Sequence, residues 1–156
     1  MVEIDEAVKQ KIKQFIANKD VCVIATCSEN KPRASTVNYV SDDFTLYAVT
    51  SEKSTKAKNV GINSNVSVAI DNQGKQERAC LQAEGVAKVL SGIEAEQAKE
   101  FYSQKRDLSH HEPELVDTVL KIKLKEVMFT DYVKGVLKVY KFKLYNGSKA
   151  LSPALP

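Results

Sequence analysis

The spacing of apolar and β-branched residues predicts a mostly β protein. Runs of such residues between short polar turns indicate strands, whose side chains alternate with a period of two. The predicted strands are residues 21–26, 33–40, 44–50, 77–90, 119–132 and 136–144. The turns at 28–32 and 41–43 are far too short for a crossover helix, so the first three strands form antiparallel hairpins. Gly85, inside the long 77–90 strand, indicates a bulge or bend.

Helices are predicted near the start of the chain and between two of the later strands. The first covers about residues 5–18 and has one apolar face, made by Ile4, Val8, Ile12, Phe15 and Ile16. The second lies near residues 92–106, because Ser91 and Glu94 have the spacing of a capping box. Its apolar residues are Ile93, Ala98, Phe101 and Tyr102. A short helical turn is predicted within residues 113–118.

The segment 46–60 has the layout of an anion site. A short strand ends at Thr50, hydroxyl and lysine residues follow, and a helix-like stretch begins at once. The first N–H groups of a helix have no partner within it, and the helix dipole adds positive charge, so phosphate binds well there. The candidate residues are Thr50, Ser51, Ser54, Thr55, Lys56 and Lys58. The alternative interpretation is that Ser51 or Ser54 is a plain N-cap and the lysines are solvated.

A second segment is expected to meet this cluster. Arg33 and Ser35 lie on one face of the 33–40 strand, because side chains alternate along a strand. That strand neighbours the 44–50 strand in the predicted hairpin, so its first residues should lie near the end of the 44–50 strand. Arg33 and the Ser54 cluster could then grip one phosphate together.

These elements, in this order, resemble the FMN-binding split-barrel family, whose best-known member is pyridoxamine 5′-phosphate oxidase. The resemblance covers roughly residues 4–90 well and the remainder loosely. The matching pieces are the N-terminal helix, the 21–26 strand, the Lys31-Pro32 turn, and residues 33–37, 46–50, 54–56 and 63–70. The resemblance implies an antiparallel split β-barrel with an N-terminal helix and a helix near residues 92–106. It also implies a homodimer, with FMN in the cleft between the two subunits.

The resemblance assigns roles to particular residues. Arg33, Ser54, Thr55 and Lys56 match the positions that hold the FMN phosphate, although the oxidases have arginine where this chain has Thr55. Backbone groups of the strand are implied to line the flavin ring. The remaining implied cofactor contacts are Ala34, Ser35, Thr36, Val37, Asn38, Thr50, Ser51 and Cys80. Asn38 stands where the oxidases carry a phosphate-binding lysine, and Cys80 stands near a glutamine that contacts the ring.

The C-terminal half lacks residues that one class of enzyme in this family needs. The true oxidases have an arginine–histidine pair there that handles the substrate phosphate. The arginines of this chain are Arg33, Arg78 and Arg106, and no histidine follows His111. We therefore expect an FMN-dependent oxidoreductase of a small molecule that is not an authentic pyridoxamine-phosphate oxidase. No catalytic acid or base is identified.

Two alternatives to this function remain open. The same fold could hold a deazaflavin or a haem, for which only His110 or His111 could serve as axial ligand. It could also be a non-enzymatic flavin store or sensor, or a dimeric barrel without a cofactor.

Length and composition indicate one compact domain. The chain has 156 residues, of which 43% are hydrophobic and 28% charged, near the averages for globular proteins. We expect one domain over residues 1–147 and a loosely ordered tail over 148–156. No apolar run approaches the roughly 18 residues of a membrane span. The acidic N-terminus lacks the apolar core of a signal peptide, so we expect a cytoplasmic protein.

The cysteines and histidines favour neither a disulfide framework nor a metal site. Cys22, Cys27 and Cys80 are odd in number and form no C-x-x-C pair. Cys22 is predicted to pack as a small apolar residue, whereas Cys80 is open to a functional role. Adjacent side chains such as His110 and His111 diverge, so we expect a surface loop there and no bound metal.

Positive charge is concentrated near the C-terminus. The net charge is +3, and residues 121–149 hold eight lysines and two acids, a net of +6. Lys138, Lys141 and Lys143 lie on the last predicted strand, where lysine discourages pairing with other molecules. Aromatic stacking motifs are absent, so we expect no nucleic-acid partner.

Overall fold

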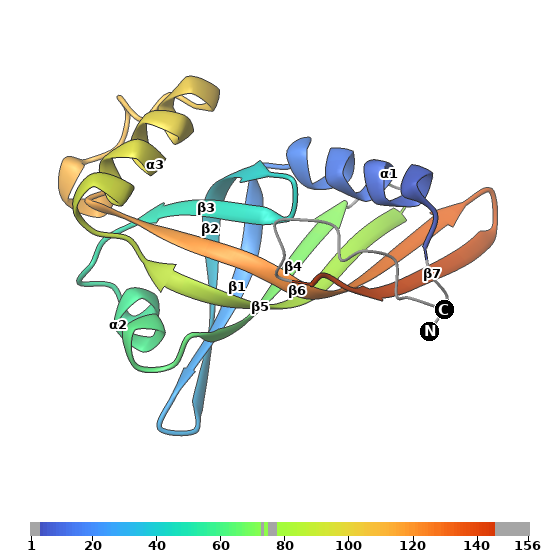
Figure 1. Cartoon of the computed structure of the whole chain (residues 1–156), viewed down its shortest axis with the longest axis horizontal. Helices are drawn as coiled ribbons and strands as arrows, with labels where there is room; N and C mark the ends of the chain where they lie inside the picture. The colour runs from blue at the N-terminus through green and yellow to red at the C-terminus, as the bar shows by residue number, and fades with distance from the viewer. Residues whose placement is uncertain (1–3, 73, 75–77, 146–156) are drawn as a thin grey trace, which may run out of the picture.

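The computed structural model describes residues 4–72, 74 and 78–145. Within them, antiparallel strands form a 7-stranded sheet in the order β3-β2-β1-β4-β5-β6-β7, and β3 also pairs with β6. The strands are β1 (Val21–Ser28), β2 (Lys31–Asp42), β3 (Thr45–Thr50), β4 (Asn65–Asn72), β5 (Arg78–Val89), β6 (Thr118–Val133) and β7 (Val136–Lys143). The sheet closes into a ring from β3 to β6, and β7 continues beyond it (Figure 1).

Strand β6 both closes the barrel and splits it. Its first residues, Thr118 to Lys123, pair with β3, whereas Glu126 to Val133 pair with β7. Its other edge pairs with β5 along almost its whole length. β3 and β7 therefore diverge from one strand, which confirms the predicted antiparallel split β-barrel.

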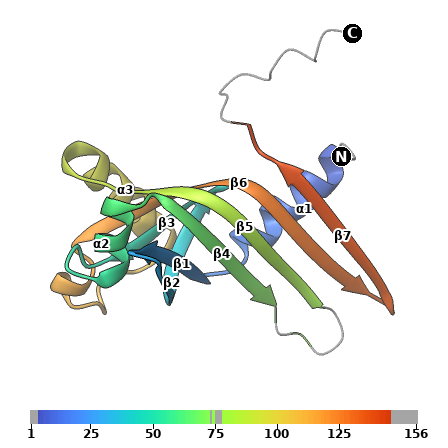
Figure 2. The same cartoon turned by 90° about the horizontal axis from the view of Figure 1, so that it is seen from below.

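Three helices cover the barrel in different places (Figures 1 and 2). α1 (Glu6–Ala17) contacts β2, α2 (Thr55–Ile62) contacts β1 and β5, and α3 (Gly92–Lys105) contacts β2, β3 and β6. A short 3-10 helix, η1 (Pro113–Leu115), follows α3 and confirms the predicted turn. None of the described helices is long and apolar enough to cross a membrane.

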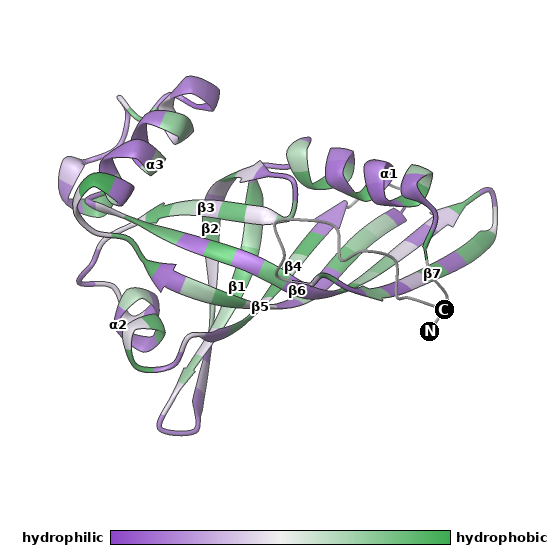
Figure 3. Ribbon diagram, viewed as in Figure 1, coloured by the Kyte–Doolittle hydropathy of each residue, from purple (hydrophilic) through white to green (hydrophobic). Residues whose placement is uncertain are grey.

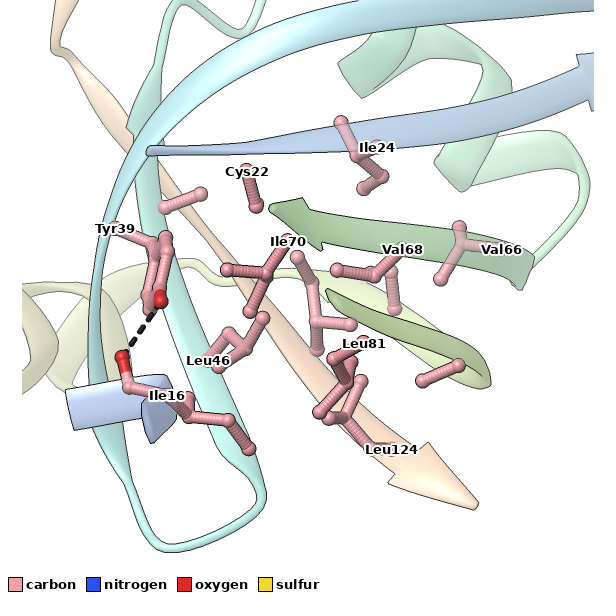
Figure 4. Packing of buried hydrophobic residues seen from close by; sticks show 14 of the residues in the cluster. Ile16, Cys22, Ile24, Tyr39, Leu46, Val66, Val68, Ile70, Leu81 and Leu124 are labelled. Carbon is pink, nitrogen blue, oxygen red and sulfur yellow. Dashed lines mark hydrogen bonds between the residues drawn. The ribbon is translucent and has the colours of Figure 1, made fainter. Parts of the chain in front are cut away.

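The apolar face of α1 fills the opening between β3 and β7. Ile12 and Ile16 are fully buried, and Phe15 meets Phe129 of β6 with ring centroids 5.1 Å apart. Figure 3 shows hydrophobic residues recurring along the strands, and Figure 4 shows how their side chains meet inside the barrel. The buried Tyr39 hydroxyl donates a 2.6 Å hydrogen bond to the Ile16 carbonyl, which ties the end of α1 to β2 (Figure 4).

Cys22 packs in this core, as predicted. Its side chain is 2% exposed, and burial raises the pKa of the thiol to about 12. The thiol therefore stays protonated at neutral pH and behaves as a small apolar group.

α3 covers a second, smaller core outside the barrel. Its buried residues are Val40, Val49, Leu90, Ala95, Ala98, Tyr102 and Val119. The helix lies where it was predicted, but the predicted capping box was wrong. Ser91 is the N-cap and makes no side-chain capping bond, because Gly92 enters the helix at a φ of +58° and the first turn is irregular. Glu94 instead pairs with Lys88, and Ile93 is 78% exposed.

The other predicted elements lie close to their observed limits. The predicted 77–90 strand is β5, although Glu77 lies outside the described residues, as does the predicted tail over 148–156. β7 pairs only with β6 among the described strands, so Lys138, Lys141 and Lys143 do lie on a strand at the edge of the sheet.

Gly85 marks a β-bulge, as predicted. The register between β5 and β6 shifts between Glu84 and Gly85. A Cβ atom at position 85 would lie 2.5 Å from the backbone oxygen of Lys123. Only glycine therefore allows the two strands to approach this closely at the bend.

We predict that Gly85→Ala destabilises the fold by about 1–3 kcal/mol, because backbone must move to admit the methyl group. Gly61→Ala is the matched control, since a Cβ on this exposed residue of α2 meets nothing within 4 Å. Alanine is favoured in helices, so this control should be neutral or slightly stabilising. Urea unfolding of both variants measures the difference, and equal stabilities would contradict the prediction.

Candidate functional site

The loop between β3 and α2 is folded by its own hydroxyl groups. Ser54 is the N-cap of α2, and its side-chain oxygen accepts a 3.2 Å hydrogen bond from the Ala57 N–H. The Ser51 hydroxyl oxygen accepts one of 3.2 Å from the Lys53 N–H. The capping role considered for these serines is therefore real for Ser54, while Ser51 shapes the turn before it.

The Ser54 hydroxyl nevertheless retains a hydrogen to donate. Its oxygen also accepts a 3.3 Å hydrogen bond from the buried Thr50 hydroxyl. A hydroxyl group has two acceptor positions and one donor, and both acceptor positions are now used. The remaining O–H is thus available to an anion in front of the helix, beside the first N–H groups of α2.

Arg33 and Lys56 bring two positive charges to this helix start. The pKa of Lys56 is lowered, first by its partial burial and then by the Arg33 guanidinium. Neither side chain forms an ion pair with any carboxylate in the described part of the chain. Two neighbouring cations without an ion-pair partner among the described residues would suit an anion.

Arg33 and Lys56 are brought together by other contacts than the predicted pairing of β2 with β3. β3 pairs with β2 only at Tyr39 to Asp42, so the end of β3 is not beside Arg33. Arg33 lies opposite Thr26 of β1, and α2 packs against β1. It is therefore the docking of α2 on β1 that places Lys56 near Arg33.

A buried hydrogen bond between α2 and β1 was not foreseen from the sequence. The Asn59 side-chain amide donates to the Thr26 hydroxyl oxygen at 3.1 Å, and the two residues are 9% and 2% exposed. The sequence feature that could have predicted this bond is Asn59 itself, a polar residue on the same side of a short helix as the apolar Ala57 and Val60.

The first part of β2 has one unpaired backbone edge. β2 pairs with β1 from Lys31 to Asn38, but its pairing with β3 begins only at Tyr39. In an antiparallel strand, alternate N–H and C=O groups point to opposite sides. Those of residues 31–38 that point away from β1 thus have no strand partner, over the segment expected to line a flavin ring.

The predicted ring residues divide between the two faces of β2. Ser35 and Val37 share a face with Arg33, and Val37 is buried. Ala34, Thr36 and Asn38 lie on the opposite face and are exposed. The backbone of this segment is therefore open, although only some of its side chains are. Thr55 is exposed at the first position of α2.

Cys80 is not brought to this cluster within one chain. It lies on β5 opposite Asp71 and Thr130, three strands away from β2 in the sheet order. At about 4.8 Å per strand, this separation is roughly 14 Å across the sheet. Cys80 instead lines a pocket with Arg78, Tyr132 and Leu137.

The histidine pair lies in an exposed loop after α3, as expected. His110 is 3.6 Å from the Asp107 carboxylate, and its side chain is 87% exposed. Within the described residues, no three His, Cys, Asp or Glu side chains are grouped closely enough to hold a metal ion.

Comparison with known proteins agrees with this architecture. Residues 8–131 match the sequence profile of the family described as pyridoxamine 5′-phosphate oxidase. No curated protein matches the chain.

Several solved structures share the fold. General Stress Protein 26 from Bacillus anthracis is 20% identical, with a TM-score of 0.66 over 88% of this chain and 98% of that one. A FAD-binding protein from Mesorhizobium loti is 19% identical, with a TM-score of 0.66, and the match covers 78% of this chain and 91% of that one. A heme binding protein from Mycobacterium smegmatis is 19% identical, with a TM-score of 0.69, and the match covers 92% of this chain and 60% of that one.

At these identities, the structural likeness establishes the fold, and the sequence profile establishes the relationship. The matched segment includes β1 to β5, α2, α3 and all but the last two residues of β6. The chain therefore belongs to the pyridoxamine 5′-phosphate oxidase family.

Proposed function

We propose that this protein binds FMN and uses it to transfer electrons to or from a small oxidisable molecule. The observation that carries the proposal is the pair of cations, Arg33 and Lys56, held at the start of α2 without a carboxylate partner among the described residues. The phosphate of FMN would lie between them, in reach of the Ser54 hydroxyl and the first N–H groups of the helix.

The flavin ring would lie along the open edge of β2. Backbone N–H and C=O groups of residues 34–38 face away from β1 there and can bond the polar edge of an isoalloxazine. Family membership and the FAD-binding relative from M. loti support a flavin at this position. The flavin supplies the redox chemistry, while the protein binds and orients it and sets the polarity around it.

A second copy of the chain would complete the site. The outer face of β1 beside this edge exposes Val21 (44%) and Val23 (38%). A two-fold dimer that covers this face would bury those side chains and enclose a ligand against β2. Cys80 would contact the ring only if the partner subunit contributes it or the ring extends across β1 and β4.

Haem is the second candidate ligand, because a heme binding protein shares the fold. The carboxylates of a haem would also suit the Arg33–Lys56 pair. The possible axial ligands, His110 and His111, are however exposed in the loop after α3, whereas the pair lies at α2. FMN accounts for the cation pair and the open β2 edge together, and is therefore preferred.

We predict that purified protein retains FMN through a desalting column and shows flavin absorption bands. Arg33→Ala combined with Lys56→Ala should abolish retention, and Lys56→Ala alone should weaken FMN binding about 10- to 100-fold, as expected for a lost charge-assisted bond. Lys58→Ala is the control, because Lys58 is about 200° around the helix from Lys56 and is exposed. Retention of haem bands, or of no ligand, would contradict the proposal.

FMN affinity should also depend on pH through Lys56. Its pKa is lowered from 10.5, so it loses its charge at a lower pH than an ordinary lysine. We expect the dissociation constant for FMN to rise as pH increases through this lowered pKa. Lys56→Arg should remain charged and bind FMN with little change over the same range. Titrations of both proteins from neutral to alkaline pH test this, since deprotonation of the flavin affects both equally. Parallel curves would rule out Lys56 as a phosphate ligand.

We further predict that the FMN-loaded protein does not oxidise pyridoxamine 5′-phosphate. No arginine follows Arg106 and no histidine follows His111, so the residues that hold that substrate's phosphate in the oxidases are missing. Pyridoxal 5′-phosphate formation, followed by absorbance beside an authentic oxidase, measures the activity. Sustained turnover would refute this restriction and leave FMN binding intact.

A further inference from the structure

The Asn59–Thr26 hydrogen bond has no catalytic role in the proposed chemistry, yet it lies directly behind the cation pair. Both partners are almost fully buried, and the donor and acceptor are 3.1 Å apart. Asn59 belongs to α2 and Thr26 to β1, so the bond joins the helix to the barrel wall.

Each partner is adjacent to one of the two cations. Thr26 is directly opposite Arg33 in the β1–β2 register, and opposed residues point to the same face. Asn59 follows Lys56 by three residues, so the two lie on the same side of α2, one turn apart. The Asn59–Thr26 bond therefore joins the position opposite Arg33 to the side of α2 that carries Lys56.

This link acts against the force between the cations. Like charges repel, and the pKa of Lys56 is lowered first by its partial burial and then by the Arg33 guanidinium. The apolar contacts of Ala57 and Val60 hold α2 on the barrel, but such contacts are non-directional and allow the helix to slide or rotate slightly. A hydrogen bond between two buried groups is directional and fixes the helix at one rotation and height.

We propose that Asn59 is a positioning residue, and that its hydrogen bond to Thr26 gives this site its preference for a phosphorylated flavin over the unphosphorylated one. The proposal rests on the function proposed above. By holding Lys56 and the Ser54 hydroxyl at a fixed distance from Arg33, the bond shapes a cradle for a phosphate monoester. It contributes nothing to the ring, which riboflavin and FMN share.

The test compares two substitutions at one position. Thr26→Ser keeps the hydroxyl oxygen that accepts from Asn59, whereas Thr26→Val keeps the shape and removes the acceptor. Dissociation constants for FMN and riboflavin are measured for each protein by the quenching of flavin fluorescence. We expect Thr26→Val to reduce the preference for FMN over riboflavin about fivefold and Thr26→Ser to leave it unchanged. Asn59→Leu, which removes the donor instead, should repeat the loss and serves if Thr26→Val does not fold.

A double-mutant cycle shows whether the effect passes through Lys56. In a Lys56→Ala background, Thr26→Val should change the preference less than it does in the wild-type protein, because the charge that the bond positions is absent and only the Ser54 hydroxyl remains to be positioned. An equal further loss in that background would overturn the proposal. So would a Thr26→Val protein that binds both flavins more weakly by the same factor, since that result indicates general damage to the fold.

The same measurements separate this inference from the function on which it rests. A wild-type protein that binds riboflavin as tightly as FMN would refute the phosphate site itself. A wild-type protein that prefers FMN, with a preference unaffected by Thr26→Val and Asn59→Leu, would refute only the positioning role.

Discussion

Three strands, β3, β5 and β7, pair with β6, and the rest of this structure follows from that shared pairing. β6 pairs with β5 along one edge and shares its other edge between β3 and β7. Such sharing requires β3 and β7 to diverge, and α1 fills the opening that results, through Ile12, Ile16 and Phe15. The β-bulge at Gly85 provides the bend, because the register changes there, close to where β6 passes from one partner to the other. A closed ring with a bulge at its turning point is a common solution for small barrels.

Barrel closure also determines where a ligand can bind. β3 is much shorter than β2 and pairs with it only at Tyr39 to Asp42, so the first part of β2 keeps an unpaired edge. An exposed strand edge invites pairing with other molecules, and proteins usually cover one or place charges along it. β7, the other exposed edge, carries Lys138, Lys141 and Lys143. In the open segment of β2 only Lys31 and Arg33 are charged, whereas Ala34, Ser35, Thr36 and Val37 are not, so a ligand or partner is a natural cover for that uncharged part.

Much of the fold was predictable, because it depends on local patterns. The apolar face of α1, the short turns between the first strands, and the glycine inside β5 each predict one structure with few competitors. The capping box at Ser91 failed because the motif fixes only residue types, whereas the helix starts through a left-handed Gly92. Ile93 is exposed because it precedes the buried Ala95 by two residues and so lies on the opposite side of α3.

The candidate site was less predictable, because it depends on contacts between distant segments. The cluster at Ser54 and the cation Arg33 were both identified, but their meeting was attributed to the pairing of β2 with β3. In the structure α2 brings them together by docking on β1, and the Asn59–Thr26 bond that fixes this docking has no motif of its own. Cys80 shows the opposite case, because a position that resembles a ring contact lies three strands away within one chain.

The charge of Lys56 opposes folding while the site is empty. The pKa of Lys56 is lower in the folded protein than its ordinary value, so the unfolded chain holds this proton more tightly. Protonated Lys56 therefore lowers the stability of the empty protein at neutral pH, and stability is regained as pH rises through the lowered pKa. A bound phosphate reverses the sign of the interaction, because it attracts both cations and raises the pKa of Lys56 again. Binding and folding are thereby coupled, and an anion that stabilises this fold should do so less when Arg33 or Lys56 is replaced by alanine.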